Sequence, residues 1–276
     1  MAQIGPTAHY TGQTWARHGL SHPELDTWTG RVMHAATAPA MRAIDIIGAP
    51  TLDGFLLSRH LVIDALREEA IAAGRVGQVL EVACGMSPRG WRFTEKHPDL
   101  VYVEADLPAM AADKRAALER IGRPANHRVV DLDALADDGA LSLPEVAARE
   151  LAPDVGLAII TEGLLSYLPR EAVLTLWARF ADAIGDRPDG LYLSDLHVDS
   201  DTPQPLARAF EAALGALVRA KVAIHFKTPE EAVEALLLAG FADAAVPTAG
   251  EHEAASDRKG ADLVRIVRAS CSPTAS

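Results

Sequence analysis

Cysteine is scarce in this chain of 276 residues, which has only Cys84 and Cys271. Two cysteines cannot build a disulfide framework, and no Cys/His cluster has zinc-finger spacing, so we expect a reducing compartment and no metal site. A basic segment followed by an apolar one is also missing from the first residues, so no secretory signal is expected. The longest apolar stretches, such as 156–161, are much too short to cross a bilayer. These absences predict a cytoplasmic protein without a membrane segment.

Basic residues are outnumbered: Lys and Arg total 26 against 38 Asp and Glu, a net charge of −12. This balance, with no basic stripe interleaved with aromatic residues, argues against nucleic acid as a partner. Aromatic residues make up only 5%, whereas hydrophobic residues reach 49% and the mean hydropathy is +0.07. Such a composition is typical of an aliphatic-rich, folded enzyme and excludes a disordered chain.

From residue 78 onward, short apolar runs alternate with helical patterns. We expect strands at 78–82, 101–106, 127–130, 155–161, 190–194, 242–246 and 263–267. We expect helices at 89–95, 109–121, 143–151, 170–184, 206–223 and 229–238. This alternation predicts an α/β fold, Rossmann-like, with a mostly parallel seven-stranded sheet covered by helices on both faces.

The first 74 residues lack this alternation of strand and helix patterns. Residues 1–30 are polar without a sustained period and predict an irregular arm. Helical spacing follows over 31–47, with a break expected at Pro39, and over 52–73. We therefore predict an N-terminal arm and helical cap at 1–74, and a core domain at 75–270 with a lid helix at 203–225.

Glycine is missing where a dinucleotide site needs it. The first strand ends in a turn in which only Gly85 remains of three glycines, with Ala83 in the first position and Pro88 in the third. A nicotinamide dinucleotide is therefore disfavoured. A small-residue turn after Glu81 does suit a cofactor whose ribose or amino-acid part approaches the main chain: Glu81 can orient that part, or the turn itself. An ordinary tight turn between strand and helix is the alternative.

Acidic residues stand at the ends of four successive predicted strands. Glu81 ends the first, and Glu104 and Asp106 end the second, where they can meet ribose hydroxyls. Asp131 follows the third and can accept from an adenine amine. Glu162 follows the fourth and lies at the crevice where doubly wound sheets bind ligands. Solvated loop carboxylates are the alternative, but the repetition favours a ligand site.

Together, the segments 81–85, 102–108, 131–132 and 162–168 resemble class I S-adenosylmethionine-dependent methyltransferases of the leucine carboxyl methyltransferase family, which includes bacterial polyketide O-methyltransferases. The resemblance runs from about residue 59 to about 168. Its specific pieces are Glu-x-Asp-x-Pro at 104–108 and Glu-Gly-Leu-x-x-Tyr-Leu at 162–168. It implies the class I methyltransferase fold and S-adenosyl-L-methionine as cofactor.

The resemblance also implies roles for individual residues. Gly85 and Asp106 would contact the methionine and ribose parts, Asp131 and Leu132 the adenine, and Glu162 the methionine amino group. Arg59 matches a family arginine that meets a carboxylate of cofactor or substrate; an exposed helix arginine is the alternative. The sequence departs from the family at Ala83, where glycine is usual, and at 86–88, where Asp-Thr is usual.

The resemblance implies an O-methyltransferase acting on a carboxylate or hydroxyl of a small molecule, such as a secondary metabolite, or of a peptide C-terminus. A carboxylate acceptor needs no general base, whereas a hydroxyl needs one, for which His197 and His225 are candidates. We expect the substrate to be enclosed by Tyr10, Trp15, Tyr167 and Phe210. A non-catalytic binding or regulatory protein on the same fold is the alternative. A homodimer is the commonest closed assembly.

Overall fold

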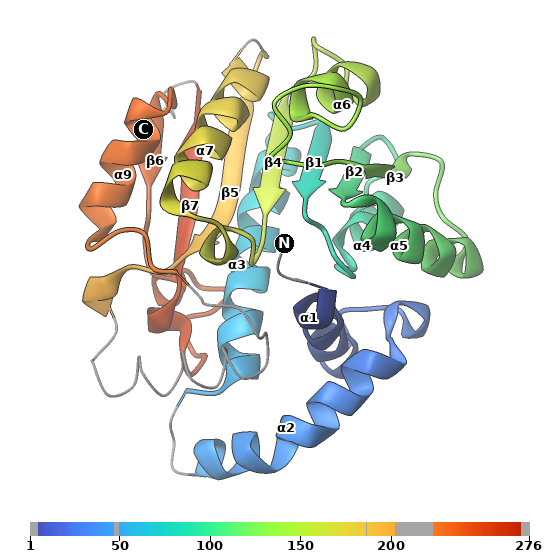
Figure 1. Ribbon diagram of the computed structural model, residues 1–276, viewed down its shortest axis with the longest axis vertical. Helices are drawn as coiled ribbons and strands as arrows, with labels where there is room; N and C mark the ends of the chain where they lie inside the picture. Colours follow the sequence, from blue (N-terminus) through green and yellow to red (C-terminus); the bar gives the residue numbers. More distant parts are fainter. Residues whose placement is uncertain (1–4, 47–49, 186, 202–222, 272–276) are drawn as a thin grey trace.

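The sheet is the organising element of the computed structural model, which describes residues 5–46, 50–185, 187–201 and 223–271. Its seven strands run in the order β3-β2-β1-β4-β5-β7-β6 (Figure 1). The strands are β1 (Gln78–Val82), β2 (Val101–Asp106), β3 (His127–Asp131), β4 (Leu157–Thr161), β5 (Gly190–Leu196), β6 (Asp243–Ala245) and β7 (Arg265–Ser270). Strands β1 to β5 are parallel, and β7 runs antiparallel to β5 and β6. The predicted fold class is confirmed.

The central strands are buried along their whole length, as expected of parallel strands covered on both faces. Strand β1 pairs with β2 on one side and with β4 on the other, and Val82 stands opposite Thr161 at the carboxyl ends. Strands β2 and β3 are added on one side of β1, and β4 and β5 on its other side, so the order of strand addition reverses between β1 and β4. This is the position at which doubly wound sheets bind ligands, and it brings the turn after β1 next to the loop that carries Glu162.

Helices cover both faces. One face carries α3 (Leu52–Ala72), α4 (Arg89–Lys96) and α5 (Pro108–Ile121); the other carries α6 (Leu143–Glu150), α7 (Arg170–Gly185) and α9 (Pro229–Leu238) (Figure 1). Short helical turns complete the described chain: η1 (Pro23–Leu25), η2 (Leu165–Tyr167), η3 (Asp199–Asp201), η4 (Ala249–Glu251) and η5 (Ala261–Leu263). In the described part of the chain, no helix has both the length and the apolar character of a membrane span.

The N-terminal region differs from its prediction. Residues expected to be an irregular arm form α1 (Gly5–Arg17), which packs on α2 (Trp28–Ile46) and α3 below the carboxyl edge of the sheet (Figure 1). Tyr10 and Trp15 of α1 are buried in the core that α3 shares with the sheet. Tertiary packing of these two aromatic side chains stabilises a helix that the hydrophobic periodicity of the sequence does not predict.

Two further expectations about this region need correction. Helix α2 continues through Pro39, because Pro39 and Ala35 lie on an exposed face where water can satisfy the Ala35 carbonyl that the proline leaves free. Helix α3 was assigned to the cap but packs on β5 and β7, so the cap proper consists of α1 and α2. The predicted lid helix lies mostly outside the described residues, and so does Phe210.

Candidate functional site

The turn after β1 packs directly against α1. Gly85 has φ +51°, and a Cβ on it would stand 3.0 Å from the Ala8 Cβ. A Cβ on Gly12 would stand 3.1 Å from the Cβ of Met86. Ala83 also has a left-handed φ of +56°, a conformation that favours glycine. Ala83 therefore replaces the glycine that is usual in the family, but its backbone keeps the left-handed conformation that glycine favours.

Asp106 ties this turn to the end of β2. Its Oδ2 accepts the Gly85 N–H at 2.7 Å, and its Oδ1 accepts the Leu107 N–H at 2.8 Å. Burial raises the pKa of Asp106, although both N–H groups act in the opposite direction. The carboxylate is only partly buried, and each oxygen retains a lone pair. Asp106 can therefore accept hydrogen bonds from a pair of hydroxyls at the sheet edge.

Glu104 does not share this position. Its side chain has no exposed surface, and its oxygens lie 2.7 Å from Lys114 Nζ and 2.8 Å from His127 Nε2. The Gly90 N–H donates to the same carboxylate at 3.2 Å. A carboxylate enclosed in this way cannot reach a ribose, so the prediction for Glu104 is corrected: the residue joins β2 to α4, α5 and β3.

Of the two residues predicted to contact adenine, Asp131 lies at the surface and Leu132 lies in the core. Asp131 is partly exposed, and its Oδ1 lies 2.8 Å from Arg115 Nη1. Leu132 is only 2% exposed, packs in the core, and donates its N–H to the Asp106 carbonyl at 2.8 Å. The Leu132 side chain therefore has no surface for an adenine ring, which corrects that prediction, whereas Asp131 stays accessible.

Glu162 contacts three basic side chains. Arg59 Nε donates to its Oε1 at 3.0 Å, and Oε2 lies 3.0 Å from His60 Nδ1 and also accepts from Arg89. Burial alone would raise the pKa of Glu162, but Arg89, His60 and Arg59 outweigh burial and hold the pKa well below its usual range. Glu162 is therefore ionised at every physiological pH.

Arg89 is the buried centre of this cluster, and sequence reasoning missed it. It opens α4, has no exposed side-chain surface, and donates to Asp64 Oδ1 at 2.6 Å and to Glu81 Oε1 at 3.0 Å as well as to Glu162. Glu81 also accepts from the Tyr102 hydroxyl at 2.6 Å. Glu81 is itself only 2% exposed, so it orients Arg89 and does not reach a ligand directly, which corrects its prediction.

Asp195 on β5 completes the cluster, and it too was missed. Its Oδ2 accepts from Arg59 Nη1 at 2.8 Å, and its Oδ1 accepts the Gly163 N–H at 2.6 Å. A signal existed: Asp195 directly follows the predicted fifth strand, just as Asp106 and Glu162 end or follow theirs.

The two histidines proposed as bases lie near each other. Val198 and Phe226 form an isolated parallel bridge, and His197 and His225 each precede one of these residues. The His197 ring stacks on Phe55, with centroids 5.1 Å apart. Burial lowers the pKa of His197, against an opposing effect of Asp195. His225 Nε2 lies 3.0 Å from the Leu165 carbonyl, a contact in which Nε2 carries the proton.

The predicted substrate enclosure is brought together only in part. Tyr10 and Trp15 are each 1% exposed; Trp15 stacks on His60 with centroids 4.0 Å apart, and Tyr10 stacks on His34. Trp15 packs against His60, which contacts Glu162, whereas Tyr10 packs between α1 and α2. Neither side chain has a free face for a substrate, which corrects both predictions. Tyr167 is half-buried in η2, close to Glu162 in sequence.

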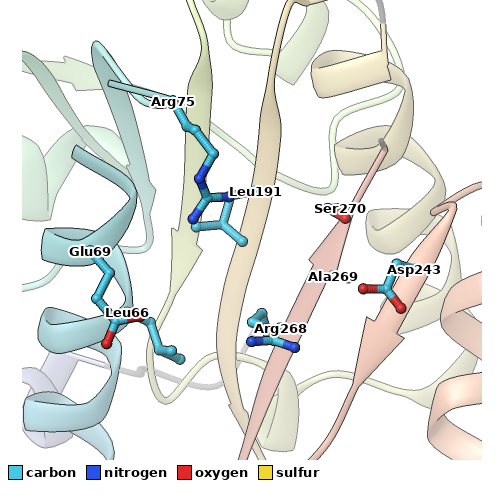
Figure 2. A pocket seen from close by; sticks show the side chains of 8 residues that line it. All are labelled: Leu66, Glu69, Arg75, Leu191, Asp243, Arg268, Ala269 and Ser270. Carbon is cyan, nitrogen blue, oxygen red and sulfur yellow. The ribbon is translucent and has the colours of Figure 1, made fainter. Parts of the chain in front are cut away.

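Two hollows lie at the opposite edge of the sheet. Figure 2 shows the first, of about 40 Å³, between Glu69 and Arg75 on one side and Arg268 and Asp243 on the other, near the start of β5. The second, of about 310 Å³, adjoins Gly77 and Leu100 just before β1 and β2. The first has room for about one water, and both lie at the amino edge, far from the carboxyl-edge cluster. Among the described residues, no group of three or more metal-ligating side chains is found.

Comparison with solved structures shows the fold. A candidate methyltransferase from Thermobifida fusca YX has a TM-score of 0.65 at 17% identity, covering 95% of this chain and 93% of that one. A DUF574 family protein from Streptomyces avermitilis MA-4680 has a TM-score of 0.65 at 14% identity, covering 95% and 96%.

Sequence comparison identifies the family. Over 132 residues the chain is 32% identical to a candidate S-adenosyl-L-methionine-dependent methyltransferase of Mycolicibacterium gilvum (strain PYR-GCK). That match covers 48% of this chain and 40% of the relative, so the chain spans well under half of the curated relative's length. Residues 7–181, more than half of the chain, match the family described as leucine carboxyl methyltransferase. The chain therefore belongs to the leucine carboxyl methyltransferase family.

Proposed function

We propose that this protein is an S-adenosyl-L-methionine-dependent O-methyltransferase. The observation that carries the proposal is the arrangement at the carboxyl edge of the sheet: Asp106 lies beside the Gly85 turn, and Arg59 and Glu162 form a charge pair at the neighbouring loop. Family membership and the fold of the solved relatives support it.

The residues present fit such a cofactor. A partly exposed carboxylate at the end of β2 suits the two ribose hydroxyls, and the methionine end is a zwitterion. Arg59 and Glu162 present one cationic and one anionic group about 3.0 Å apart, matching the carboxylate and ammonium of that end. Asp131 is accessible for the adenine amine. The bound cofactor would supply an electrophilic methyl group on a sulfonium sulfur.

The contribution of the chain is mainly alignment. Methyl transfer is an in-line displacement, for which holding the two reactants in line is worth about 7–11 kcal/mol. Helix α1 packs against the turn, and the buried ion pairs of Glu162 with Arg59 and Arg89 hold its carboxylate in place. A carboxylate acceptor is already ionised and needs no proton transfer.

For a hydroxyl acceptor, we propose His197 as the general base. It follows β5 at the carboxyl edge, and its lowered pKa keeps the imidazole neutral and able to accept a proton at neutral pH. His225 is the second candidate; its Nε2 is engaged by a carbonyl, which leaves Nδ1 as the accepting nitrogen.

We further propose a small-molecule or peptide acceptor and a cytoplasmic location. Secondary metabolism is one setting for such an acceptor. The net charge of −12 disfavours nucleic acid, and a homodimer is the proposed assembly.

Calorimetric titration with S-adenosylhomocysteine tests the proposal directly. We expect micromolar binding by the wild type and a loss of roughly 30-fold or more in Glu162→Ala, because truncating one partner of a buried charge pair typically costs 2–5 kcal/mol. Asp106→Ala should weaken binding by about tenfold, since hydrogen bonds to a charged group contribute about 1.5–3 kcal/mol. Reduced nicotinamide adenine dinucleotide is the control ligand and should not bind.

The result that contradicts the proposal is a folded wild-type protein that does not bind S-adenosylhomocysteine. Binding without turnover, across a panel of carboxylate and phenol acceptors, would instead favour the non-catalytic protein on the same fold.

The protonation state of His197 can be tested without knowing the acceptor. We expect its imidazole to titrate below the ordinary pKa of 6.5, because burial disfavours the charged form. An NMR titration of the histidine ring resonances, with the His197 signal assigned by its loss in His197→Gln, measures this. A His197 pKa above 6.5 would contradict the lowered pKa on which its proposed role as a neutral base rests.

A further inference from the structure

Asp195 holds together two elements that meet at the proposed methionine end of the site. It lies near the carboxyl end of β5, is 4% exposed, and uses each carboxylate oxygen for a different partner. One oxygen accepts from Arg59 of α3, and the other accepts the main-chain N–H of Gly163 in the loop after β4. The carboxylate therefore joins a helix of one layer to a loop of the sheet edge.

These contacts close a ring around Glu162. Gly163 is bonded to Asp195, Glu162 precedes Gly163 in the chain, the Glu162 side chain accepts from Arg59, and Arg59 returns to Asp195. Every link is a hydrogen bond of 2.6–3.0 Å or a covalent bond. Closing the ring fixes both the backbone and the carboxylate of Glu162, which no single contact would do.

Gly163 shows how tightly the ring is packed. Its φ is +69°, and a Cβ placed on it would lie 3.0 Å from Arg59 Nη2 and 3.3 Å from Nη1. The loop therefore approaches the guanidinium as closely as a residue without a side chain allows. Asp195 keeps both members of this contact in place through its two oxygens.

We propose that Asp195 is a positioning residue that sets Arg59 and Glu162 for the amino-acid end of the cofactor. This inference rests on the proposed function. Asp195 acts on the affinity for the carboxylate and ammonium groups, because its two side-chain hydrogen bonds lead to Arg59 and to the Glu162–Gly163 loop. The adenosine end is held at β2 and β3, where Asp195 makes no contact among the described hydrogen bonds and ion pairs.

Asp195→Asn separates this role from a general effect on folding, because asparagine keeps the shape but loses the charge that pairs with Arg59. The two ligands to be titrated are S-adenosylhomocysteine and 5′-methylthioadenosine, which shares the adenosine part but lacks the amino-acid group. We expect the variant to lose about tenfold or more in affinity for S-adenosylhomocysteine and less than about twofold for 5′-methylthioadenosine.

Asp201→Asn is the matched control. Asp201 also pairs with an arginine through both oxygens, but that arginine is Arg265 on β7. Among the described hydrogen bonds, none joins Asp201 to Arg59 or Glu162. The Asp201→Asn variant should bind both ligands with the affinity of the wild type. If Asp195→Asn does not fold, Gly163→Ala tests the same ring from its other side and should show the same selective loss.

The outcomes separate the inference from the proposed function. A wild type that binds neither ligand overturns both. A wild type that binds both, with an Asp195→Asn variant that is unchanged or weakened equally for the two ligands, overturns the positioning role and leaves the proposed function standing. A selective loss for S-adenosylhomocysteine in Asp195→Asn, absent in Asp201→Asn, supports the role.

Discussion

Replacing Arg89 by methionine is expected to lower the free energy of unfolding by roughly 3–5 kcal/mol, the usual cost of removing one partner from a buried ion pair. The guanidinium has no exposed surface and donates to Asp64, Glu81 and Glu162. Without it, Glu81 loses the cation it pairs with, and Asp64 and Glu162 each lose one of theirs, in a medium of low dielectric constant. Urea unfolding measures the loss, and binding of S-adenosylhomocysteine should disappear with it.

Arg92→Met is the matched control for this experiment. Arg92 lies on the same helix and pairs with the same Asp64 at 3.1 Å, but its side chain is 30% exposed. An ion pair that water can reach contributes about 0–1 kcal/mol, so the control should cost no more than that. Equal losses in the two variants would show that burial of the cluster is not what makes Arg89 essential.

The second large effect is a loss of folding stability at low pH that comes from Glu104. The ordinary pKa of Glu104 is 4.5 and falls to about 2 in the folded protein: burial would raise it, but Lys114 and His127 outweigh burial. Because the folded-state pKa is lowered, the stability from this carboxylate is complete above pH 4.5 and is lost as the pH falls toward 2. A shift of this size corresponds to about 3 kcal/mol.

Comparing the wild type with Glu104→Gln isolates this contribution. The variant cannot titrate at this position, so the excess stability of the wild type should be about 3 kcal/mol larger at pH 7 than near pH 2, and should shrink as the pH falls below 4.5. Urea unfolding at several pH values measures the difference. Glu119→Gln, on an exposed position of α5, is the control and should show no excess at any pH. A difference for Glu104 that does not vary with pH would contradict the assignment.

Much of the fold was predictable because its signals are local. A buried parallel strand needs a short apolar run, and a following helix needs a turn of small residues and an apolar stripe; both conditions are met within a few neighbouring positions. Strand β1 and helix α9 consequently have the same bounds as predicted, and β2 does too. The acidic strand ends Asp106 and Glu162 were recognisable for the same reason.

Helix α1 was not predictable in this way. Its residues show no sustained period, and the helix exists because Tyr10 and Trp15 find a hydrophobic core contributed mainly by α3 and the sheet. Packing of this kind depends on residues far away in the chain, whereas local propensity carries little information about so short a segment.

The order of strands and helices along the chain, the turn with Gly85 and the row of acidic strand ends follow from local sequence, because each depends on neighbours within one or two turns. Which of these carboxylates is buried and which faces the site depends on the packing of distant segments. Arg59 meets Glu162 and Asp195 across 103 and 136 residues of chain. Charged residues are usually exposed, so their burial as a paired cluster arises only when the folded chain brings opposite charges together in a dry interior.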